Sequence, residues 1–327
     1  MLSIGIIKEG KIPADSRVPL TPKQCQIIKQ QFGINVFIQS SPKRSYKDEE
    51  YLRHGVPVVE DVQHCSILMG VKEVPIDQLI PDKTYFFFSH TIKKQPHNRK
   101  LLQAILAKNI RLIDYEVLTD DNGNRLIAFG KFAGIVGAHN GLWTYAQRTN
   151  SFSVKRMKDL HDYAEGIAQY KGIKLPLIKI VLTGTGRVAT GAKMFLQDIG
   201  IQEVNSEDYL SKTFNFPVFT QLDCSEYVER IDGSTYNKQD FYEFPEKYKS
   251  SFTPYTKVTN IMINGIYWDS RSPAFFTLED MRKPDFKIKT IADVTCDIAP
   301  SSIPSTIKAN TIDEPVYGFD PFTENIA

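Results

Sequence analysis

The chain has 327 residues, enough for two domains that each bury their own core. Hydrophobic residues make up 42% and charged residues 24%, an ordinary globular composition that excludes a disordered or fibrous protein. Lys and Arg number 40 against 38 Asp and Glu, and the net charge of +2 gives no field for nucleic acid or anionic lipid. We therefore expect a folded protein without nucleic-acid or membrane partners.

The sequence predicts neither a targeting segment nor a metal site. Charged residues appear within the first nine positions, too early for a signal peptide, and no later run has the length of a bilayer span. We therefore expect a cytoplasmic protein. The histidine spacing indicates no metal, and the four cysteines lack a CxxC pair, which favours reduced, mostly buried thiols at Cys25, Cys65, Cys224 and Cys296.

Short strands and helices alternate over the first part of the chain. Residues 3–7 predict a strand, and Thr21-Pro22 predicts the N-cap and first turn of a helix. Further strands are expected at 35–38, 66–71, 84–88 and 110–114, with a helix over 99–108. This alternation predicts an α/β fold in which a parallel sheet has helices on its faces.

A long, mostly helical stretch at 135–170 marks the crossing to a second domain. We expect a first domain over 1–134 and a second over 135–309, with 310–327 returning to the first. Apolar runs at 178–183, 259–268 and 288–294 provide the second core. The polar and aromatic segment 205–257 has weak periodicity, and we expect it to form a strand and a long excursion outside the core.

A glycine motif follows the apolar run 178–183. Gly184, Gly186 and Ala189 form G-x-G-x-x-A directly before the helical residues 192–196. In such a motif the first glycine makes a tight turn, the second lets the backbone approach a pyrophosphate, and the small third residue lets helix and strand pack closely. Its place between strand and helix favours dinucleotide binding over a glycine-rich turn without a ligand.

The residue that meets the adenosine ribose is expected about 20 residues after the first glycine. There, the run 201–204 ends at Asn205, whose neutral side chain leaves both NAD and NADP open as the cofactor. Asp208 becomes the candidate for the ribose-binding residue if the strand that begins at residue 201 is longer.

Lys72 and His90 each follow an apolar run of the first domain, where parallel sheets bind ligands. A partly desolvated lysine near other cations has a lowered pKa and exchanges protons, and histidine needs little adjustment for that role. The alternative is a solvated lysine and a structural histidine. Arg17 and Arg125 suit the carboxylates of an acidic substrate, and Lys93 and Gln95 follow His90 closely.

Several motifs occur together: RVPLTP at 17–22, GVK at 70–72, FFSHTIK at 87–93, IRLIDYE at 110–116, AFGKFAG at 128–134, TGTG at 183–186, INGIYW at 263–268 and ADVTCD at 292–297. Their combination resembles the family of saccharopine dehydrogenase (L-lysine-forming) and lysine-2-oxoglutarate reductase, within the alanine dehydrogenase and transhydrogenase group. The resemblance covers nearly the whole chain.

The resemblance implies two Rossmann-like domains with a cleft between them, and reversible NAD(P)-dependent oxidation of saccharopine to L-lysine and 2-oxoglutarate. It implies that Lys72 is the proton acceptor and His90 the proton donor. Implied substrate contacts are Arg17, Lys93, Gln95, Arg125 and Phe129, and implied cofactor contacts are Gly186, Arg187, Ile266, Ala292, Asp293, Val294 and Thr295.

Two other functions stay open. An alanine dehydrogenase shares the fold and the lysine–histidine pair but takes a far smaller substrate. A dinucleotide-binding protein without catalysis is the second alternative, because the resembling proteins continue for several tens of residues past the position of Ala327, and that segment returns to their first domain.

Overall fold

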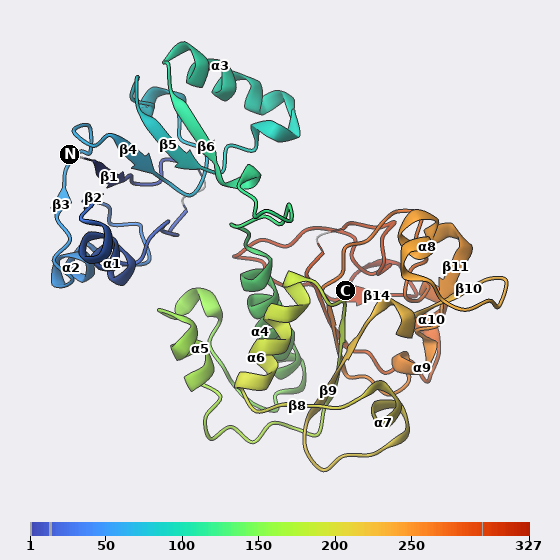
Figure 1. The fold of residues 1–327 in the computed structure, drawn as a ribbon. Coiled ribbons are helices and arrows are strands. Elements are labelled where there is room, and N and C mark those ends of the chain that lie inside the picture. The colour runs from blue at the N-terminus through green and yellow to red at the C-terminus, as the bar shows by residue number, and fades with distance from the viewer. Residues whose placement is uncertain (1, 13–14, 296) are drawn as a thin grey trace. The chain divides into compact units, whose positions relative to one another are not determined.

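The computed structural model describes residues 2–12, 15–295 and 297–327. It divides the chain into two compact units, Met1–Ala128 (unit 1) and Phe129–Ala327 (unit 2), shown in Figure 1. The boundary comes slightly earlier than expected because Gly134 is already inside a helix of unit 2. The segment 310–327 also differs from expectation: it belongs to unit 2, where the carbonyl of Ile312 accepts a hydrogen bond from Arg156.

Unit 1 is built on a six-stranded, fully parallel sheet with the order β3-β2-β1-β4-β5-β6. The strands are β1 (Ser3–Ile6), β2 (Asn35–Gln39), β3 (Val58–Val59), β4 (Ile67–Met69), β5 (Thr84–Phe87) and β6 (Arg111–Asp114). The strands and the parallel sheet expected here are confirmed. All six carboxyl ends therefore lie along one edge.

Helices cover both faces of this sheet. They are α1 (Pro22–Phe32), α2 (Asp48–Arg53) and α3 (Arg99–Ala107), with short 3-10 turns η1 (Ile76–Gln78), η2 (Thr91–Lys93), η3 (Pro96–Asn98) and η4 (Tyr115–Val117). The predicted N-cap is confirmed, because the Thr21 hydroxyl accepts from the Gln24 amide and the Gln24 side chain accepts from the Thr21 amide. Separate apolar clusters form under α1–α2 and under α3.

Unit 2 has a five-stranded parallel sheet with the order β13-β12-β7-β9-β8. Its strands are β7 (Lys179–Thr183), β8 (Gln202–Glu203), β9 (Val218–Leu222), β12 (Ile261–Asn264) and β13 (Thr290–Asp293). Two small antiparallel pairs lie outside this sheet: β10 (Val228–Arg230) with β11 (Tyr248–Ser250), and β14 (Phe319–Asp320) with β15 (Asn325–Ile326).

Two helices of unit 2 cross in direct backbone contact, and Figure 1 draws them side by side: α4 (Gly130–Thr149) and α6 (Arg187–Asp198). A Cβ atom added at Gly134 would lie 1.8 Å from the Val188 carbonyl oxygen, and one at Gly191 would lie 1.9 Å from the Lys131 carbonyl oxygen. Only glycine permits this approach. The remaining helical elements are α5 (Tyr163–Ala168), α7 (Ser206–Ser211), α8 (Lys238–Glu243), α9 (Thr253–Thr256), α10 (Leu278–Arg282), η5 (Met157–Asp159), η6 (Cys224–Glu226) and η7 (Pro245–Lys247).

The expectation that 205–257 lies outside the core is wrong. The segment supplies β9, an inner strand of the sheet, and a cluster of buried aromatic rings that includes Tyr209, Tyr227, Phe241 and Phe252. Large rings bury much area at irregular spacing, and a search for periodicity does not detect such a core.

Cys25 and Cys65 are buried and Cys224 is half-buried, whereas Cys296 lies outside the described residues. Within the described part of the chain, no helix combines the length and apolar character needed to cross a membrane.

Candidate active site

Lys72 and His90 lie beyond the carboxyl ends of two adjacent strands of unit 1. β4 ends at Met69 and β5 at Phe87, and the two strands pair in parallel. Both side chains are half-buried, so each is partly withdrawn from water without being enclosed. His90 also has a φ of +55°, a conformation rare for residues other than glycine and typical of functional sites.

The Glu73 carboxylate contacts both Lys11 and His90. Its Oε1 lies 2.5 Å from Nδ1 of His90, and its Oε2 accepts a hydrogen bond from Lys11 Nζ at 2.7 Å. Burial alone would raise the pKa of Glu73, but the hydrogen bonds from Lys11 and His90 lower it to about 2. The carboxylate is therefore ionised at neutral pH, and it orients the imidazole so that Nε2 is the ring nitrogen that remains for a reactant.

Lys72 is held by its backbone, and the pKa of its amine is lowered. The amides of Val71 and Lys72 donate to the two carboxylate oxygens of Glu9 at 2.7 and 3.0 Å. Burial, followed by the positive charge of Arg17, lowers the pKa of the Lys72 amine. Arg17 forms a bidentate pair with Asp15, with distances of 2.9 Å from Nε and 2.5 Å from Nη2. Burial and the Arg17 charge both favour the neutral amine, the form that can accept a proton.

A second group of cations surrounds Glu116, just beyond β6. Lys93 Nζ and Arg125 Nη1 lie 3.6 and 3.8 Å from Glu116 Oε1. The Arg125 guanidinium also lies 5.8 Å from the centre of the Phe88 ring, and that ring stacks against His90 with 6.2 Å between centroids. The Phe88 ring therefore connects the Arg125 guanidinium to the imidazole.

The structure does not join every predicted substrate residue to these groups. Gln95 is exposed and precedes η3 without a side-chain capping bond, and no described contact connects it to His90 or Glu73. Phe129 belongs to unit 2, where it precedes the first turn of α4 and is 36% exposed.

Sequence reasoning missed the acidic partners and one cation of the site: Glu9, Lys11, Asp15, Glu73 and Glu116. A signal was available for three of them. Glu9, Glu73 and Glu116 each follow the end of a strand of the same sheet within a few residues, the same rule that identified Lys72 and His90.

In unit 2 the glycine loop joins β7 to α6 as expected. Gly184 has a φ of +94°, and a Cβ there would lie 3.0 Å from the Gly265 carbonyl oxygen, so the tight turn requires glycine. Gly186 precedes the first turn of α6, and a Cβ there would meet no described protein atom within 4 Å. The space over the amino end of a twelve-residue helix is thus open to an anion.

The other predicted cofactor residues divide into two sets. Arg187 is exposed and begins α6. Ile266 lies just after β12, and Ala292–Thr295 span the end of β13; all of these residues are half-buried. β12 and β13 lie on the same side of β7 in the sheet. Asn205 is different, because β9 lies between its strand β8 and β7. Its side chain caps α7 by accepting from the Asp208 amide at 2.8 Å. Asn205 therefore does not lie at the strand end beside the glycine loop.

Asp293 has its carboxylate engaged by protein donors. Oδ1 accepts from Asn264 Nδ2 at 3.1 Å and from the Thr295 hydroxyl at 2.8 Å, and Oδ2 accepts from the Thr306 hydroxyl at 2.7 Å. The side chain thus ties the ends of β12 and β13 to the segment that follows.

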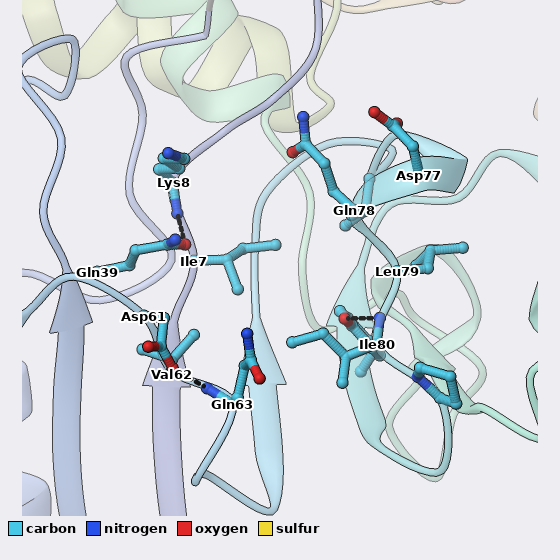
Figure 2. Close-up of a pocket in the computed structure, with 13 residues that line it drawn as sticks. Ile7, Lys8, Gln39, Asp61, Val62, Gln63, Asp77, Gln78, Leu79 and Ile80 are labelled. Atoms are coloured by element: carbon cyan, nitrogen blue, oxygen red, sulfur yellow. Dashed lines mark hydrogen bonds between the residues drawn. The ribbon is translucent and has the colours of Figure 1, made fainter.

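Unit 1 also contains a cavity of about 500 Å³, shown in Figure 2. Its lining includes the polar side chains of Lys8, Gln39, Asp61 and Gln78 together with Val62 and Tyr85. Among the described residues, none of the candidate catalytic or substrate-binding side chains lines it. The described residues also contain no group of three or more His, Cys, Asp or Glu able to hold a metal ion.

Part of the chain matches a known family model. Residues 5–136 match the family described as alanine dehydrogenase/PNT, N-terminal domain. The match includes the last two residues of β1, the strands β2 to β6 and the groups around Glu73 and Glu116.

Homologues align with nearly the whole chain. Over 97% of its length the chain is 30% identical to the alpha-aminoadipic semialdehyde synthase of Arabidopsis thaliana, of which it covers 34%. Over 87% of its length it is 28% identical to the saccharopine dehydrogenase [NAD(+), L-lysine-forming] of Schizosaccharomyces pombe, of which it covers 73%. The chain thus spans about a third of the length of the semialdehyde synthase.

A solved L-alanine dehydrogenase has a similar fold. The TM-score is 0.59 at 17% identity, and the alignment covers 97% of this chain and 80% of that one. The predicted fold class, parallel sheets flanked by helices in a Rossmann-type α/β protein, is confirmed.

Proposed function

We propose that this chain is an NAD(P)-dependent amino-acid dehydrogenase that interconverts saccharopine with L-lysine and 2-oxoglutarate. The observation that carries the proposal is the group at the carboxyl edge of the unit 1 sheet, where a lysine amine of lowered pKa and a carboxylate-oriented histidine stand among arginine and lysine side chains. The homology to saccharopine dehydrogenases and semialdehyde synthases supports it.

The reaction needs two proton-handling groups. Oxidation removes a hydride from carbon and a proton from the secondary amine of saccharopine, and the resulting imine adds water and then splits into lysine and 2-oxoglutarate. NAD(P)+ supplies the hydride acceptor when it is bound. The neutral Lys72 amine takes the amine proton, and His90 Nε2 handles the protons of water and of the collapsing carbinolamine. Glu73 holds the imidazole in position during that step.

Saccharopine has three carboxylates, and unit 1 offers several cations for them. Arg17, Lys93 and Arg125 are 40–50% exposed at the side chain, so a ligand carboxylate can reach each of them. Asp15 and Glu116 hold these cations in place. We assign Gln95 and Phe129 to the remaining substrate contacts on the strength of the sequence resemblance.

Unit 2 fits a dinucleotide. The open space at Gly186 would take the pyrophosphate, held by the first amides of α6 and by Arg187, while Gly184 and Ala189 allow the close packing of turn, strand and helix. Ile266, Ala292, Val294 and Thr295 would contact the nicotinamide half, and Asp293 would hold their segment in place.

The test follows the absorbance of NADH and, separately, of NADPH with purified protein, lysine and 2-oxoglutarate. Lysine-dependent oxidation is the expected result. A Lys72→Met variant should lose this turnover while it still binds the dinucleotide. Oxidation with pyruvate and ammonia in place of lysine and 2-oxoglutarate would assign an alanine dehydrogenase activity, and dinucleotide binding without turnover on either pair would indicate a binding protein.

A further inference from the structure

The backbone of His90 is held in an unfavourable conformation by the residues around it. Its φ of +55° lies in the left-handed region, which a residue with a Cβ atom keeps only when its surroundings impose it. The His90 carbonyl accepts from the Lys93 amide at 3.1 Å and from Asn98 Nδ2 at 3.4 Å. On either side of His90 stand Ser89 and Thr91, whose hydroxyl oxygens lie 2.7 Å apart. These bonds matter because the backbone conformation sets the direction of the imidazole.

The bonds of Ser89 and Thr91 lead to the carboxylate of Asp114. Asp114 ends β6, where it pairs with Phe87, the last residue of β5. Its Oδ2 accepts from the Ser89 hydroxyl, and from the Ser89 amide at 3.3 Å. A hydroxyl has one proton, and Ser89 gives this proton to Asp114. The Ser89 oxygen therefore accepts from Thr91, both from the hydroxyl and from the amide at 3.1 Å. Both neighbours of His90 are thus fastened to one carboxylate.

Asp114 also fastens a second segment of the candidate site. Its Oδ1 accepts from the Glu116 amide at 2.9 Å and so caps η4. Glu116 is the acidic partner of two cations of the site. Asp114 is 7% exposed and Ser89 has no exposed surface, so water does not replace a bond that is lost here. One buried carboxylate therefore holds the His90 segment with one oxygen and the Glu116 segment with the other.

We propose that Asp114 is a positioning residue for catalysis: through Ser89 and Thr91 it directs the His90 imidazole to Glu73, and through the cap of η4 it keeps Glu116 beside its cations. The inference rests on the proposed function of unit 1. Asp114 itself touches no reactant. While the backbone is held, His90 Nδ1 lies 2.5 Å from Glu73 Oε1, and Nε2 faces the reactant. Without the bonds to Asp114 the backbone of His90 relaxes, and the imidazole leaves Glu73.

Three variants separate the two roles of Asp114 in saccharopine oxidation at saturating dinucleotide. Ser89→Ala breaks the connection to His90 and leaves the η4 cap, so kcat should fall at least about ten-fold while the KM for saccharopine stays unchanged. Asp114→Ser has one side-chain oxygen, which caps η4 but cannot also reach Ser89, and should behave like Ser89→Ala. Asp114→Ala loses both connections, so kcat should fall and KM should also rise.

A second measurement follows the imidazole without any turnover. In protein with isotope-labelled histidine, long-range proton–nitrogen correlation spectra show which ring nitrogen carries the proton, and His90→Gln assigns the signals. The unaltered chain at alkaline pH should carry it on Nδ1, because the ionised Glu73 carboxylate accepts there. In Ser89→Ala and Asp114→Ser the proton should no longer be confined to Nδ1, a change that a general loss of stability does not produce.

Asp280→Ser is the matched control. The Asp280 carboxylate also accepts from an amide and a hydroxyl of one residue, Thr277, at 2.8 and 2.9 Å, but it lies in α10 of unit 2. This variant should keep kcat, KM and the His90 signal even where its stability falls. Circular dichroism checks that each variant is folded, and Ser89→Ala, which removes only a hydroxyl, tests the proposal alone if the Asp114 variants do not fold.

The outcomes distinguish the two levels of the proposal. An unaltered chain that does not oxidise saccharopine would overturn the proposed function and, with it, the catalytic role of Asp114. If the unaltered chain is active, an unchanged kcat in folded Ser89→Ala, or a His90 proton that stays on Nδ1 in that variant, would overturn the role of Asp114 alone.

Discussion

Charges around Glu73 set the proton affinity of the neighbouring amine. Burial and Arg17 lower the pKa of Lys72, whereas the Glu73 carboxylate raises it. Glu73 itself stays ionised across the whole physiological range, because its hydrogen bonds from Lys11 and His90 outweigh burial and lower its pKa to about 2. One carboxylate therefore moderates the basicity of Lys72 and orients His90 at the same time.

A Glu73→Gln variant separates these two effects. Removing the negative charge lowers the pKa of Lys72 further. Saccharopine oxidation uses the neutral amine, and the rate rises with pH through this pKa, so the rising limb of the kcat/KM profile should move to lower pH. The amide oxygen of glutamine orients His90 through a weaker hydrogen bond than the carboxylate does, so the maximal rate should also fall, by about ten-fold. Exposed Glu60, altered in the same way, should change neither, and an unmoved limb in Glu73→Gln would contradict the coupling.

A buried histidine in α4 makes unit 2 sensitive to acid. His139 has no exposed surface, its Nδ1 lies 3.0 Å from the Tyr170 hydroxyl, and burial lowers its pKa to about 4. The ordinary value of 6.5 applies when the chain is unfolded. Between these two pH values the unfolded state binds more protons than the folded state, so stability falls as the pH falls through this window.

For His139 we expect the free energy of unfolding to drop by about 2 kcal/mol between pH 7 and pH 5 through this one group. Urea denaturation of the unaltered chain and of His139→Gln at both pH values measures it. His139→Gln has no imidazole to protonate. Its free energy of unfolding should therefore fall by about 2 kcal/mol less than that of the unaltered chain between pH 7 and pH 5, whatever its stability at pH 7. Equal drops in the two proteins would show that His139 does not contribute.

The positions of the strands and helices along the chain were largely predictable, but the order of the strands within the sheet was not. The strands of unit 1, the Thr21 cap and the strand–glycine–helix unit at Gly184 all have short-range signals in periodicity, capping and turn residues. The insertion of β9 between β7 and β8 has no short-range sequence signal, because strand order depends on which long-range pairing buries the most surface. For this reason the spacing rule points to Asn205, although the strand before Asn205 does not pair with β7.

The candidate site also contains both residues with a short-range sequence signal and contacts without one. Lys72, His90 and the two arginines could be predicted as candidates because they follow strand ends or match a motif. The pairing of Glu73 with both Lys11 and His90 has no sequence pattern, because it joins three separate segments. The aromatic core of 205–257 was missed for a related reason, since ring packing follows no fixed period.

The crossing of α4 and α6 depends on two glycines, and Gly134→Ala tests it. The added methyl group would collide with the Val188 carbonyl, so the helices must move apart, and we expect a loss of about 2–3 kcal/mol in the free energy of unfolding by urea. Gly186→Ala is the control. Its methyl group meets no described protein atom, so stability should change by about 1 kcal/mol or less, while NADH binding should weaken. The reverse ranking of the two stabilities would contradict the close crossing.

The two units divide the chemistry between them. Unit 1 has its own two apolar clusters and carries the groups to which we assign proton transfer and carboxylate binding, and unit 2 has two further clusters and carries the glycine loop. Because each core is complete within its unit, a ligand that binds one unit stabilises the elements of that unit first.

Amide hydrogen exchange of the full chain with and without NADH tests this division of roles. NADH should slow exchange most strongly at the glycine loop and first turn of α6 (183–190), at the end of β9 (222–226) and after β12 (264–266), because these segments converge on the open space at Gly186. The cap at Thr21 and helix α3 should keep their rates. Gly186→Ala should reduce the protection at all three segments together, since they share one ligand. Protection strongest in unit 1, or unaffected by Gly186→Ala, would place the dinucleotide elsewhere.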